Sequence, residues 1–460
     1  MPHHRPVAKF AALVLLALPC TSFAAEVPVV DVRAYPSLQA AIDANPGRQI
    51  RLPAGEFTID RALSITHDNT ELYGPARIVQ TNPKVPILRI DKARGIRLSN
   101  LTFTRSEGRQ EAEEHGIVMN NVEDVELSHL RVSENHSHST IYVRNGRDVT
   151  VADSVIINYK GLSIDDRTHS KLYGYAFKAI DGTGIQMYGV HGATIRNNRI
   201  QEYRLLPTKE IRDHYEVGTL TKVTTPGQLA PKDMIDSRYT NNWHQGSGIQ
   251  VTTPDKMSQV LITGNYLENP AQGIDIHADN VIVSNNIVTH GLMGMKAMHG
   301  SKHVLIDGNQ FDHVDLWGVM LMPGAASHAS ANAADGKPPV TENVDGGHIV
   351  SNNIFSNFGF GEQYWNWVGN KPRGVGSNVI ALLGGQLPEN PPLRNVLITG
   401  NIVYDSGQDT KLVNGQWTKL EPRYKHALYV EQEKEPKPVN VLSYVNLFDP
   451  GYQNVSNLPK

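Results

Sequence analysis

The chain has 460 residues, a formal net charge of −3 at pH 7 and a single cysteine, Cys20. A charge balance this close to neutral gives no electrostatic case for nucleic acid or a membrane surface as a partner. One cysteine also excludes a disulfide framework within the chain, so the stability has to come from a long apolar core.

The N-terminus is typical of a secretory signal peptide. Basic residues precede the apolar run Phe10–Leu18, and Ser22-Phe23-Ala24 supplies the cleavage-site pattern. The run is too short to span a bilayer, and Pro19 before Cys20 argues against a lipoprotein. We expect cleavage after Ala24 and export to the periplasm or the extracellular space. The mature chain, residues 25–460, is then expected to be soluble, with no membrane span.

Residues 37–58 are typical of the terminal unit of a repeat architecture. Residues 37–44 predict a short amphipathic helix, and residues 49–57 predict a strand closed by a Pro53-Ala54-Gly55 turn. A solenoid needs a unit that covers the open end of its core, and a helix fits there. From about residue 95 coils follow, with residues 96–103, 125–132 and 149–156 each predicted as one alternating strand.

An asparagine recurs after the later strands, and the residue that precedes it in the sequence is always a second asparagine or a glycine. An asparagine suits a tight turn, because it tolerates left-handed backbone angles and its side chain bonds neighbouring backbone groups. We predict that these asparagines stack as a structural ladder; they are Asn198, Asn265, Asn286, Asn309, Asn353 and Asn401.

A five-residue pattern that starts with glycine recurs at intervals of about 21 to 25 residues, which indicates a solenoid. Its copies are Gly248–Thr252, Gly273–His277, Gly294–Met298 and Gly318–Met322. Each alternates apolar with other residues, so each predicts a strand with one inward and one outward side.

The parity of these strands predicts a polar patch. If Ile274 and Ile276 point inward, Asp275 and His277 point outward. Gln250, Asp275 and Lys296 then form one outward column, with Thr252, His277 and Met298 beside it. Strands of adjacent coils lie about 4.8 Å apart, so Asp275, His277 and Lys296 are predicted to meet as the candidate active site. Arg144 is placed in the same outward column several coils earlier.

Four interruptions of the coils are predicted as loops, at about residues 203–246, 323–346, 359–374 and 404–425. Insertions in repeat proteins map to loops on one face, often the binding face. The first contains Asp236, Arg238, Trp243 and His244, and the third contains Tyr364, Trp365 and Trp367.

The chain resembles the right-handed parallel β-helix proteins of the pectate-lyase-like superfamily over roughly residues 30–445. The matching residues are Leu38-Gln39-Ala40-Ala41-Ile42 and Leu52-Pro53-Ala54-Gly55, followed by coils with asparagine at the turn. The resemblance implies an all-β fold, a single right-handed parallel β-helix with an N-terminal capping helix and long loop insertions. It also implies a long carbohydrate in a groove on one sheet, without choosing among lyase, hydrolase, epimerase, esterase or tailspike.

A narrower stretch, Gly273-Ile274-Asp275-Ile276-His277-Ala278-Asp279, is similar to the Gly-Phe-Asp-Pro-His-Asp sequence of mannuronan C5-epimerases and related alginate lyases. The similarity implies proton transfer at C5 by His277 and a part for Asp275 in neutralising the uronate. The chain departs from the family at Ile276, which replaces proline, and at Gln272, where one subgroup has a catalytic tyrosine. Gln250 stands where the family has a neutralising lysine, and Lys296 lies one coil later.

β-Elimination on a uronide needs a base for the C5 proton, a group that neutralises the carboxylate, and an acid for the leaving oxygen. His277 or Lys296 would be the base and its neighbour the neutralising group. Arg238 and His244 would close over the groove as acid or base, and Arg144 would hold a distant sugar acid.

Two alternatives stay open. Hydrolysis needs two carboxyl groups about 5 to 9.5 Å apart, which Asp275 with Asp279 or Asp236 would supply, or the pair Asp165-Asp166. The run Gly161-Leu162-Ser163-Ile164 before that pair equally fits one more coil. The other alternative is a catalytically inert glycan-binding β-helix.

Further residues around the patch are predicted to bind a polysaccharide or oligosaccharide, because amides form hydrogen bonds and aromatic rings stack on sugar rings. They are Gln186, Tyr188, Gln250, Thr252, Asp279, His299, Arg144, Trp243, Tyr364, Trp365 and Trp367. Met298, Met320 and Met322 predict an apolar floor or packing under the 323–346 loop.

The predicted chemistry requires no cofactor, although outward carboxylates leave calcium open as a ligand. His136 and His138 are interpreted as part of a turn rather than as a zinc pair. The sequence shows no pattern that predicts an oligomeric state.

Overall fold

The computed structural model describes most of the chain after the predicted signal peptide. The residues described are 29–106, 112–166, 176–203, 213–216, 246–253, 256–323, 344–361, 377–385, 390–404, 410–419 and 422–458. None of the helices in these ranges is long and apolar enough to cross a membrane.

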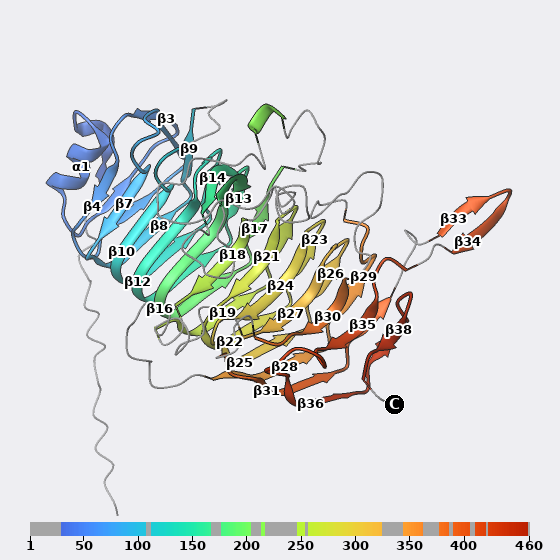
Figure 1. The fold of residues 1–460 in the computed structure, drawn as a ribbon. Helices are drawn as coiled ribbons and strands as arrows, with labels where there is room; N and C mark the ends of the chain where they lie inside the picture. Colours follow the sequence, from blue (N-terminus) through green and yellow to red (C-terminus); the bar gives the residue numbers. More distant parts are fainter. Residues whose placement is uncertain are drawn as a thin grey trace, which may run out of the picture.

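The chain winds into a stack of coils with three faces (Figure 1). Each strand pairs in parallel with the strand one coil later, as β21 does with β24 and β22 with β25. Two faces belong to one 22-stranded sheet, because three long strands run across both: β10 (Ile117–Ser128), β12 (Ser139–Ala152) and β16 (Thr183–Arg196).

Face 1 consists of the first halves of those long strands and of nine shorter strands. These are β4 (Leu63–Ile65), β7 (Leu88–Asp91), β18 (Ser247–Thr252), β21 (Gln272–Ile276), β24 (Met293–Met298), β27 (Trp317–Met322), β30 (Asn378–Leu382), β35 (His426–Val430) and β38 (Asn454–Ser456).

Face 2 consists of the second halves of the long strands and of ten shorter ones. These are β1 (Val30–Asp31), β2 (Gln49–Arg51), β5 (Glu71–Tyr73), β8 (Arg94–Ser99), β19 (Ser258–Thr263), β22 (Asp279–Ser284), β25 (Lys302–Asp307), β28 (Asp345–Ser351), β31 (Leu393–Thr399) and β36 (Val439–Tyr444).

Face 3 is a separate 12-stranded sheet. Its strands are β3 (Gly55–Ile59), β6 (Ala76–Gln80), β9 (Thr102–Arg105), β11 (Arg131–Ser133), β13 (Val155–Ile157), β17 (Arg199–Gln201), β20 (Tyr266–Glu268), β23 (Ile287–Thr289), β26 (Gln310–Asp312), β29 (Ile354–Ser356), β32 (Ile402–Tyr404) and β37 (Leu447–Phe448).

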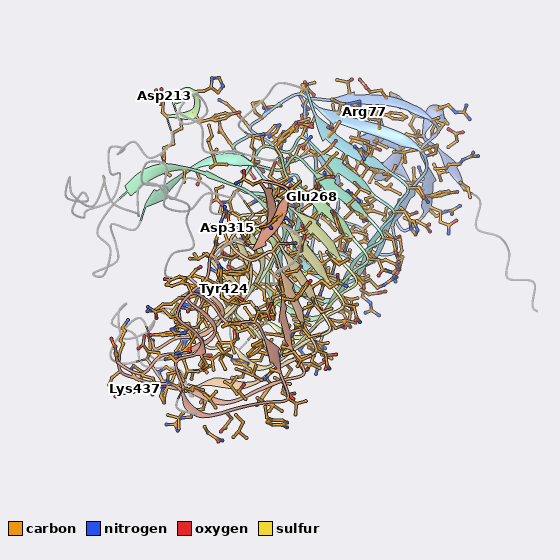
Figure 2. All side chains as sticks on the ribbon, turned by 90° about the vertical axis from the view of Figure 1, so that its right-hand side faces the viewer. Arg77, Asp213, Glu268, Asp315, Tyr424 and Lys437 are labelled. Carbon is orange, nitrogen blue, oxygen red and sulfur yellow. The ribbon has the colours of Figure 1, made fainter. Side chains whose placement is uncertain are left out.

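The core lies between the three faces, and Figure 2 shows side chains both there and on the outer surface along the stack. On face 1 the inward column is aliphatic or methionine and fully buried from β12 to β30. Its members are Ile141, Ile185, Ile249, Ile274, Met295, Val319 and Ile380. The parity predicted from Ile274 and Ile276 is therefore correct.

The glycine that begins each repeat makes room for a core side chain of face 3. A Cβ on Gly294 would lie 2.5 Å from the Phe311 ring and 2.3 Å from the Gly318 carbonyl oxygen. A Cβ on Gly318 would meet the Phe355 ring at 2.4 Å. The repeat therefore carries glycine because two backbones and a large residue approach closely at this point.

The asparagine ladder runs along the turn between faces 2 and 3. The Oδ1 of Asn309 accepts hydrogen bonds from the backbone N–H and the Nδ2 of Asn286, both at 3.0 Å, and Asn309 bonds Asn353 in the same way. The ladder extends to Asn446. The left-handed angle belongs to the preceding residue, as at Asn285 with φ 55°, so two neighbours share the roles that the sequence suggested for one.

The predicted helix is α1 (Leu38–Ala44), which lies at the N-terminal end of the stack (Figure 1). Ser37 caps its first turn, and Leu38, Ala41 and Ile42 are buried. The side chain of Gln39 bonds the backbone of Ser64 in β4, which ties the helix to face 1. A short 3-10 helix, η1 (Val32–Ala34), precedes it.

Some sequence predictions were wrong. Residues 96–103, 125–132 and 149–156 each contain the end of a face 2 strand, a turn and the start of a face 3 strand, so none is a single strand. The run from Gly161 is not a coil, because β14 (Gly161–Asp166) pairs antiparallel with β15 (Ala176–Asp181). The 404–425 interruption contains a second hairpin, β33 (Thr410–Val413) and β34 (Gln416–Lys419).

Candidate functional site on face 1

The outward side of face 1 carries two adjacent columns of polar side chains. Gln186, Gln250, Asp275 and Lys296 are register partners on successive coils, in the column that the sequence predicted. The second column runs through Tyr188 and Thr252 to His277, whose backbone N–H donates to the Val251 carbonyl at 2.8 Å.

Asp275, His277 and Lys296 are brought together as expected. The Nε2 atom of His277 lies 2.9 Å from Oδ1 of Asp275, and the Nζ atom of Lys296 lies 3.3 Å from Oδ2. Gln250 donates a hydrogen bond from Nε2 to the same Oδ2 at 3.0 Å. One carboxylate therefore receives an imidazole, an ammonium group and an amide.

The carboxylate is the floor of this cluster. The side chain of Asp275 is 3% exposed, against 13% for His277 and 15% for Lys296. Burial alone would raise the pKa of Asp275, but the adjoining charges of His277 and Lys296 outweigh it, and with the hydrogen bonds they hold that pKa well below its usual range. Asp275 is therefore anionic at neutral pH, and the two groups above it reach solvent.

The partners of His277 favour one tautomer. Its Nε2 faces the Asp275 carboxylate, in close contact but not aligned as a hydrogen bond, whereas Nδ1 lies 3.0 Å from the Thr252 hydroxyl. A carboxylate beside Nε2 favours the proton on that nitrogen, which leaves the lone pair on Nδ1. Thr252 then donates its hydroxyl proton to Nδ1, a bond that a substrate can replace.

A chain of hydrogen bonds continues from Asp275 toward the N-terminal coils. The amide of Gln186 donates to Oε1 of Gln250, and the hydroxyl of Ser139 donates to Oε1 of Gln186. Because Asp275 can only accept, the orientation of both amides follows from it. The predicted substrate-binding residues Gln186 and Gln250 thus form a fixed polar floor.

Aromatic rings follow on the same side of the site. Tyr142 precedes Gln186 in the Asp275 column and stacks on His115 with ring centroids 4.2 Å apart. The ring centroid of Tyr188 lies 5.8 Å from that of Tyr142. Sequence analysis singled out Tyr188 but missed Tyr142 and His115, although the alternation around Tyr142 was a usable signal.

Apolar side chains lie on the opposite, C-terminal side. Met298 and Met320 are buried and pack together with Ala381, and Met322 and Trp317 pack against them. The expected methionine cluster exists, but its two central members are only 4% and 3% exposed. This favours the packing interpretation over an open floor.

The other predicted residues have mixed outcomes. Arg144 is exposed and aligned with Tyr188 and Thr252, which places it in the column of His277, not in that of Asp275. His299 packs edge-on against His277 with ring centroids 4.4 Å apart. Asp279 lies on face 2, with Oδ2 3.4 Å from Nζ of Lys302.

Seven candidates lie outside the described residues, so the structure does not place them. They are Asp236, Arg238, Trp243, His244, Tyr364, Trp365 and Trp367. Their segments nevertheless leave and rejoin the solenoid between a face 3 strand and the next face 1 strand, as the 404–425 interruption also does. The 323–346 interruption joins β27 to β28, so insertions flank face 1 at both ends of its strands.

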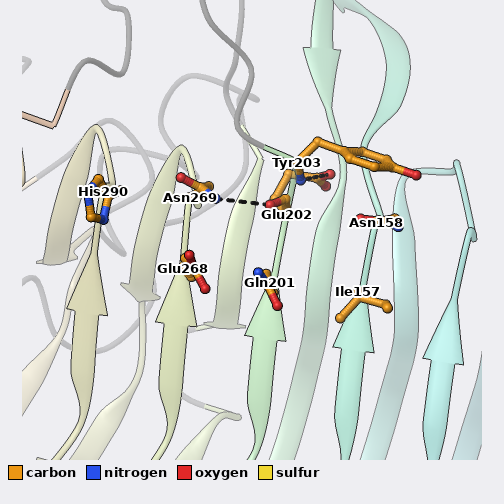
Figure 3. Close-up of a pocket in the computed structure, with 8 residues that line it drawn as sticks. All are labelled: Ile157, Asn158, Gln201, Glu202, Tyr203, Glu268, Asn269 and His290. Atoms are coloured by element: carbon orange, nitrogen blue, oxygen red, sulfur yellow. Dashed lines mark hydrogen bonds between the residues drawn. The ribbon is translucent and has the colours of Figure 1, made fainter.

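A separate pocket of about 660 Å³ lies at the corner after face 3 (Figure 3). Its lining includes Glu202, whose two carboxylate oxygens accept the backbone N–H groups of Tyr159 and Tyr203. Burial raises the pKa of Glu202 to about 7. Neither Asp275 nor His277 lines this pocket, and we assign Glu202 to holding the corner, because both of its oxygens are already used.

His136 belongs to a turn and not to a metal site. His136 is buried, with Nδ1 2.9 Å from the Lys160 carbonyl oxygen and Nε2 3.0 Å from Glu134, as expected for a turn. Within the described ranges, no three His, Cys, Asp or Glu side chains are grouped so as to hold a metal ion. Calcium binding stays an untested expectation.

Comparison with known proteins identifies the fold. The family model described as "Right handed beta helix region" matches residues 87–204 and 233–375, more than half of the chain. A search of curated protein sequences found no match. The superfamily resemblance inferred from the sequence is thus confirmed at the level of fold.

Solved structures agree with this fold. The A-module of the mannuronan C-5 epimerase AlgE6 from Azotobacter vinelandii is 14% identical, with a TM-score of 0.51, covering 94% of this chain and 100% of that one. The Dettilon tailspike protein is 10% identical, with a TM-score of 0.49 and coverages of 94% and 67%. A PL6 alginate lyase in complex with a trisaccharide is 12% identical, with a TM-score of 0.48 and coverages of 94% and 86%. At such identities the likeness concerns the fold alone.

Proposed function

Since the chain belongs to the right-handed β-helix family, we propose that it is an exported carbohydrate-active enzyme whose site is the Asp275 cluster on face 1. It acts on a uronate-containing polysaccharide or oligosaccharide and begins by removing the proton at C5. The product is either an unsaturated sugar, as in a lyase, or the C5 epimer.

The observation that carries this proposal is the layering of the cluster. A buried anion lies beneath an imidazole and an ammonium group that are both more exposed than it is. Such a centre attracts an anionic sugar, and it offers a base and a cation at one place. Lys296 faces the sugar carboxylate, and His277 faces the C5 hydrogen.

The steps follow from these positions. Nδ1 of His277 takes the C5 proton, and the C–H electron pair moves into the carboxylate-stabilised carbanion, whose negative charge Lys296 offsets. In elimination, that electron pair forms the C4–C5 double bond while the C4–O4 bond breaks. An acid then protonates O4 of the leaving sugar. In epimerisation, a proton returns to C5 from the opposite side.

Tyr188 is the group that we assign as the acid. Burial raises the pKa of its phenol, and Tyr142 and Asp275 raise it further, so the phenol keeps its proton at neutral pH. It lies one coil from Thr252, the hydroxyl partner of His277. One subgroup of the alginate-modifying enzymes has a catalytic tyrosine where this chain has Gln272. Tyr188, from another coil, would then have the role of that tyrosine.

Glycoside hydrolysis is less well supported at this site. A hydrolase needs one carboxyl group that is protonated at neutral pH. The pKa of Asp275 is held far below that range, and Asp279 is ion-paired with Lys302. The ammonium group of Lys296 and the neutral imidazole of His277 make this centre suited to proton abstraction beside a carboxylate.

The proposal is tested by incubating the purified protein with a panel of uronate and neutral polysaccharides. A lyase produces ultraviolet absorbance, an epimerase changes the sugar composition without cleavage, and a hydrolase produces only new reducing ends. We expect one of the first two, with loss of at least about 100-fold in His277→Gln. Activity on neutral glycans alone would contradict the proposal.

Because Lys296 neutralises the carboxylate, EDTA is expected to leave the rate unchanged.

A further inference from the structure

A second Asp–His pair lies behind the candidate site, and no step of the proposed reaction uses it. Asp345, the first residue of β28, and His348 on the same strand both have fully buried side chains. Nε2 of His348 lies 3.5 Å from Oδ1 of Asp345. A buried carboxylate is costly unless it is paired or hydrogen-bonded, so its position calls for a specific role.

The other oxygen of Asp345 supports a turn beside the site. Oδ2 accepts the backbone N–H of Gly300 at 2.8 Å. Gly300 and His299 have φ angles of 93° and 58°, so both turn residues occupy the left-handed region. This conformation is less favourable for an L-residue such as His299 than for glycine, so contacts that hold the turn help to keep it there.

Ser301 joins this turn to the one that carries His277. Its hydroxyl oxygen lies 2.8 Å from the Met298 carbonyl oxygen and 3.0 Å from that of Ile276, so the two acceptors share one proton. The same oxygen accepts the N–H of Ala278 at 3.3 Å. The two turns, residues 276–278 and 298–301, are therefore one connected unit. These turns carry the half-buried rings of His277 and His299, which lie edge-on to each other.

His348 lies beside the carboxylate, in contact with it but not aligned as a hydrogen bond. Its Nδ1 accepts the backbone N–H of Val304 at 3.3 Å, so the proton of the neutral ring is on Nε2, which faces Asp345. Burial raises the pKa of Asp345, while His348, the Gly300 N–H and the charge of His277 each act to lower it. The carboxyl group is thus coupled electrostatically to the imidazole of the site.

We propose that Asp345 is a positioning residue for His277: through its hydrogen bond from the Gly300 N–H it holds the 298–301 turn, so that His299 packs against the His277 ring and restricts its rotation. The inference rests on the proposed function only for its kinetic consequence. The packing itself is testable without turnover.

The test compares Asp345→Ala with Asp345→Asn in the full-length protein. Asparagine keeps an acceptor for the Gly300 N–H, whereas alanine removes it. Asp312→Asn is the control, because Asp312 also pairs with a histidine and accepts side-chain hydrogen bonds, but on face 3. The imidazole signals of His277 and His299 are followed by NMR in histidine-labelled protein, with His277→Gln and His299→Gln to assign them.

We expect Asp345→Ala to move both signals, because each ring loses the ring-current shift from the other, and Asp345→Asn and the control to leave them in place. With a substrate identified, kcat of Asp345→Ala should fall about 10- to 100-fold with little change in KM, since misplacing a base by about 1 Å has this effect. If both signals stay in place in a folded Asp345→Ala variant, the positioning role is wrong. Should the NMR result hold but no uronate be turned over, the proposed function fails and the positioning role stands.

Discussion

At the scale of single residues, Asp275 determines the charge of the site. It is the only member of the cluster that is almost fully buried, and three side chains converge on its two oxygens. Breaking a buried ion pair by removing one partner typically costs about 3–5 kcal/mol. The same contacts of Asp275 with His277 and Lys296 therefore determine both its contribution to stability and its effect on these two side chains.

Asp275→Asn is predicted to lower the free energy of unfolding at pH 7 by about 3–5 kcal/mol. The folded-state pKa of Asp275 lies below its unfolded value of about 3.9. The stabilisation is therefore complete well above pH 3.9, and it declines by about 1.4 kcal/mol for each pH unit below it. Urea unfolding of wild type and Asp275→Asn at pH 7 and pH 3 measures the difference in their free energies of unfolding at each pH. A gap that is the same at both values would contradict the assignment.

Tyr188→Phe separates the acid from the base. We predict a fall of about 100-fold in cleavage or epimerisation, because the proton donor is lost. Exchange of the C5 hydrogen with solvent deuterium should continue, because His277 is intact. NMR of the recovered substrate measures the exchange, and wild-type product formation would remove Tyr188 from the mechanism.

The sequence predicted that Asp275, His277 and Lys296 lie together, but not how deeply each lies. Alternation around Ile274 and Ile276 determines the side from which Asp275 and His277 emerge. Burial of Asp275 depends on Gln250 and Lys296 from neighbouring coils, so it is a property of the stack. Asp345 had no sequence signal, because it meets Gly300 only after the chain has passed through residues 324–343.

At the scale of elements, the asparagine ladder stabilises the corner between faces 2 and 3. Each interior asparagine satisfies a backbone N–H and an amide of its neighbour, and its own amide bonds a strand carbonyl, as Asn309 does with Val283. The sequence predicted this ladder because its spacing and residue type repeat. The sequence did not predict the boundary between face 1 and face 2, because no residue type repeats there as asparagine does in the ladder.

Asn309→Ala is predicted to lower the free energy of unfolding by at least about 2 kcal/mol, because it leaves buried groups of Asn286 without an acceptor. Asn446→Ala is the matched variant, at the part-buried end of the described ladder, where water can replace the lost bonds. Its effect should be clearly smaller in urea unfolding. Equal effects would show that ladder position does not matter.

Gly294→Ala is predicted to destabilise the protein by about 1–3 kcal/mol or more, because the added methyl group overlaps the Phe311 ring and the Gly318 carbonyl. Gly291→Ala is the comparison, since its nearest contact is 3.3 Å. Thermal unfolding of the two variants should differ clearly. A stable Gly294→Ala protein would mean that glycine recurs there for another reason.

At the scale of the whole molecule, the two directions along face 1 are unlike. Toward the N-terminus, the Asp275 column continues through two amides to Tyr142; toward the C-terminus it continues through Met320 and Ala381 to Tyr429. Among the residues that the structure describes, only the first direction offers hydrogen-bonding amides and stacked rings within three coils of Asp275. The glycan is therefore expected to extend from Asp275 toward the N-terminal coils.

Tyr142→Ala is predicted to raise KM several-fold for long oligosaccharides and to change kcat little. Tyr142 lies three coils from Asp275, about 14 Å at about 4.8 Å per coil, so short substrates should not reach it. Tyr429→Ala, in the same column on the other side, is the control. If Tyr429→Ala raised KM instead, the direction of binding would be reversed.

If the Asp275 cluster removes the C5 proton of a uronate, hydrogen exchange at C5 in deuterated water reports that step directly. A substrate from the panel is incubated in D₂O with wild type and with His277→Gln, and C5 is observed by NMR. We expect deuterium at C5, or a C4–C5 double bond, with wild type alone. New reducing ends with the C5 hydrogen retained, or equal reaction by His277→Gln, would contradict it.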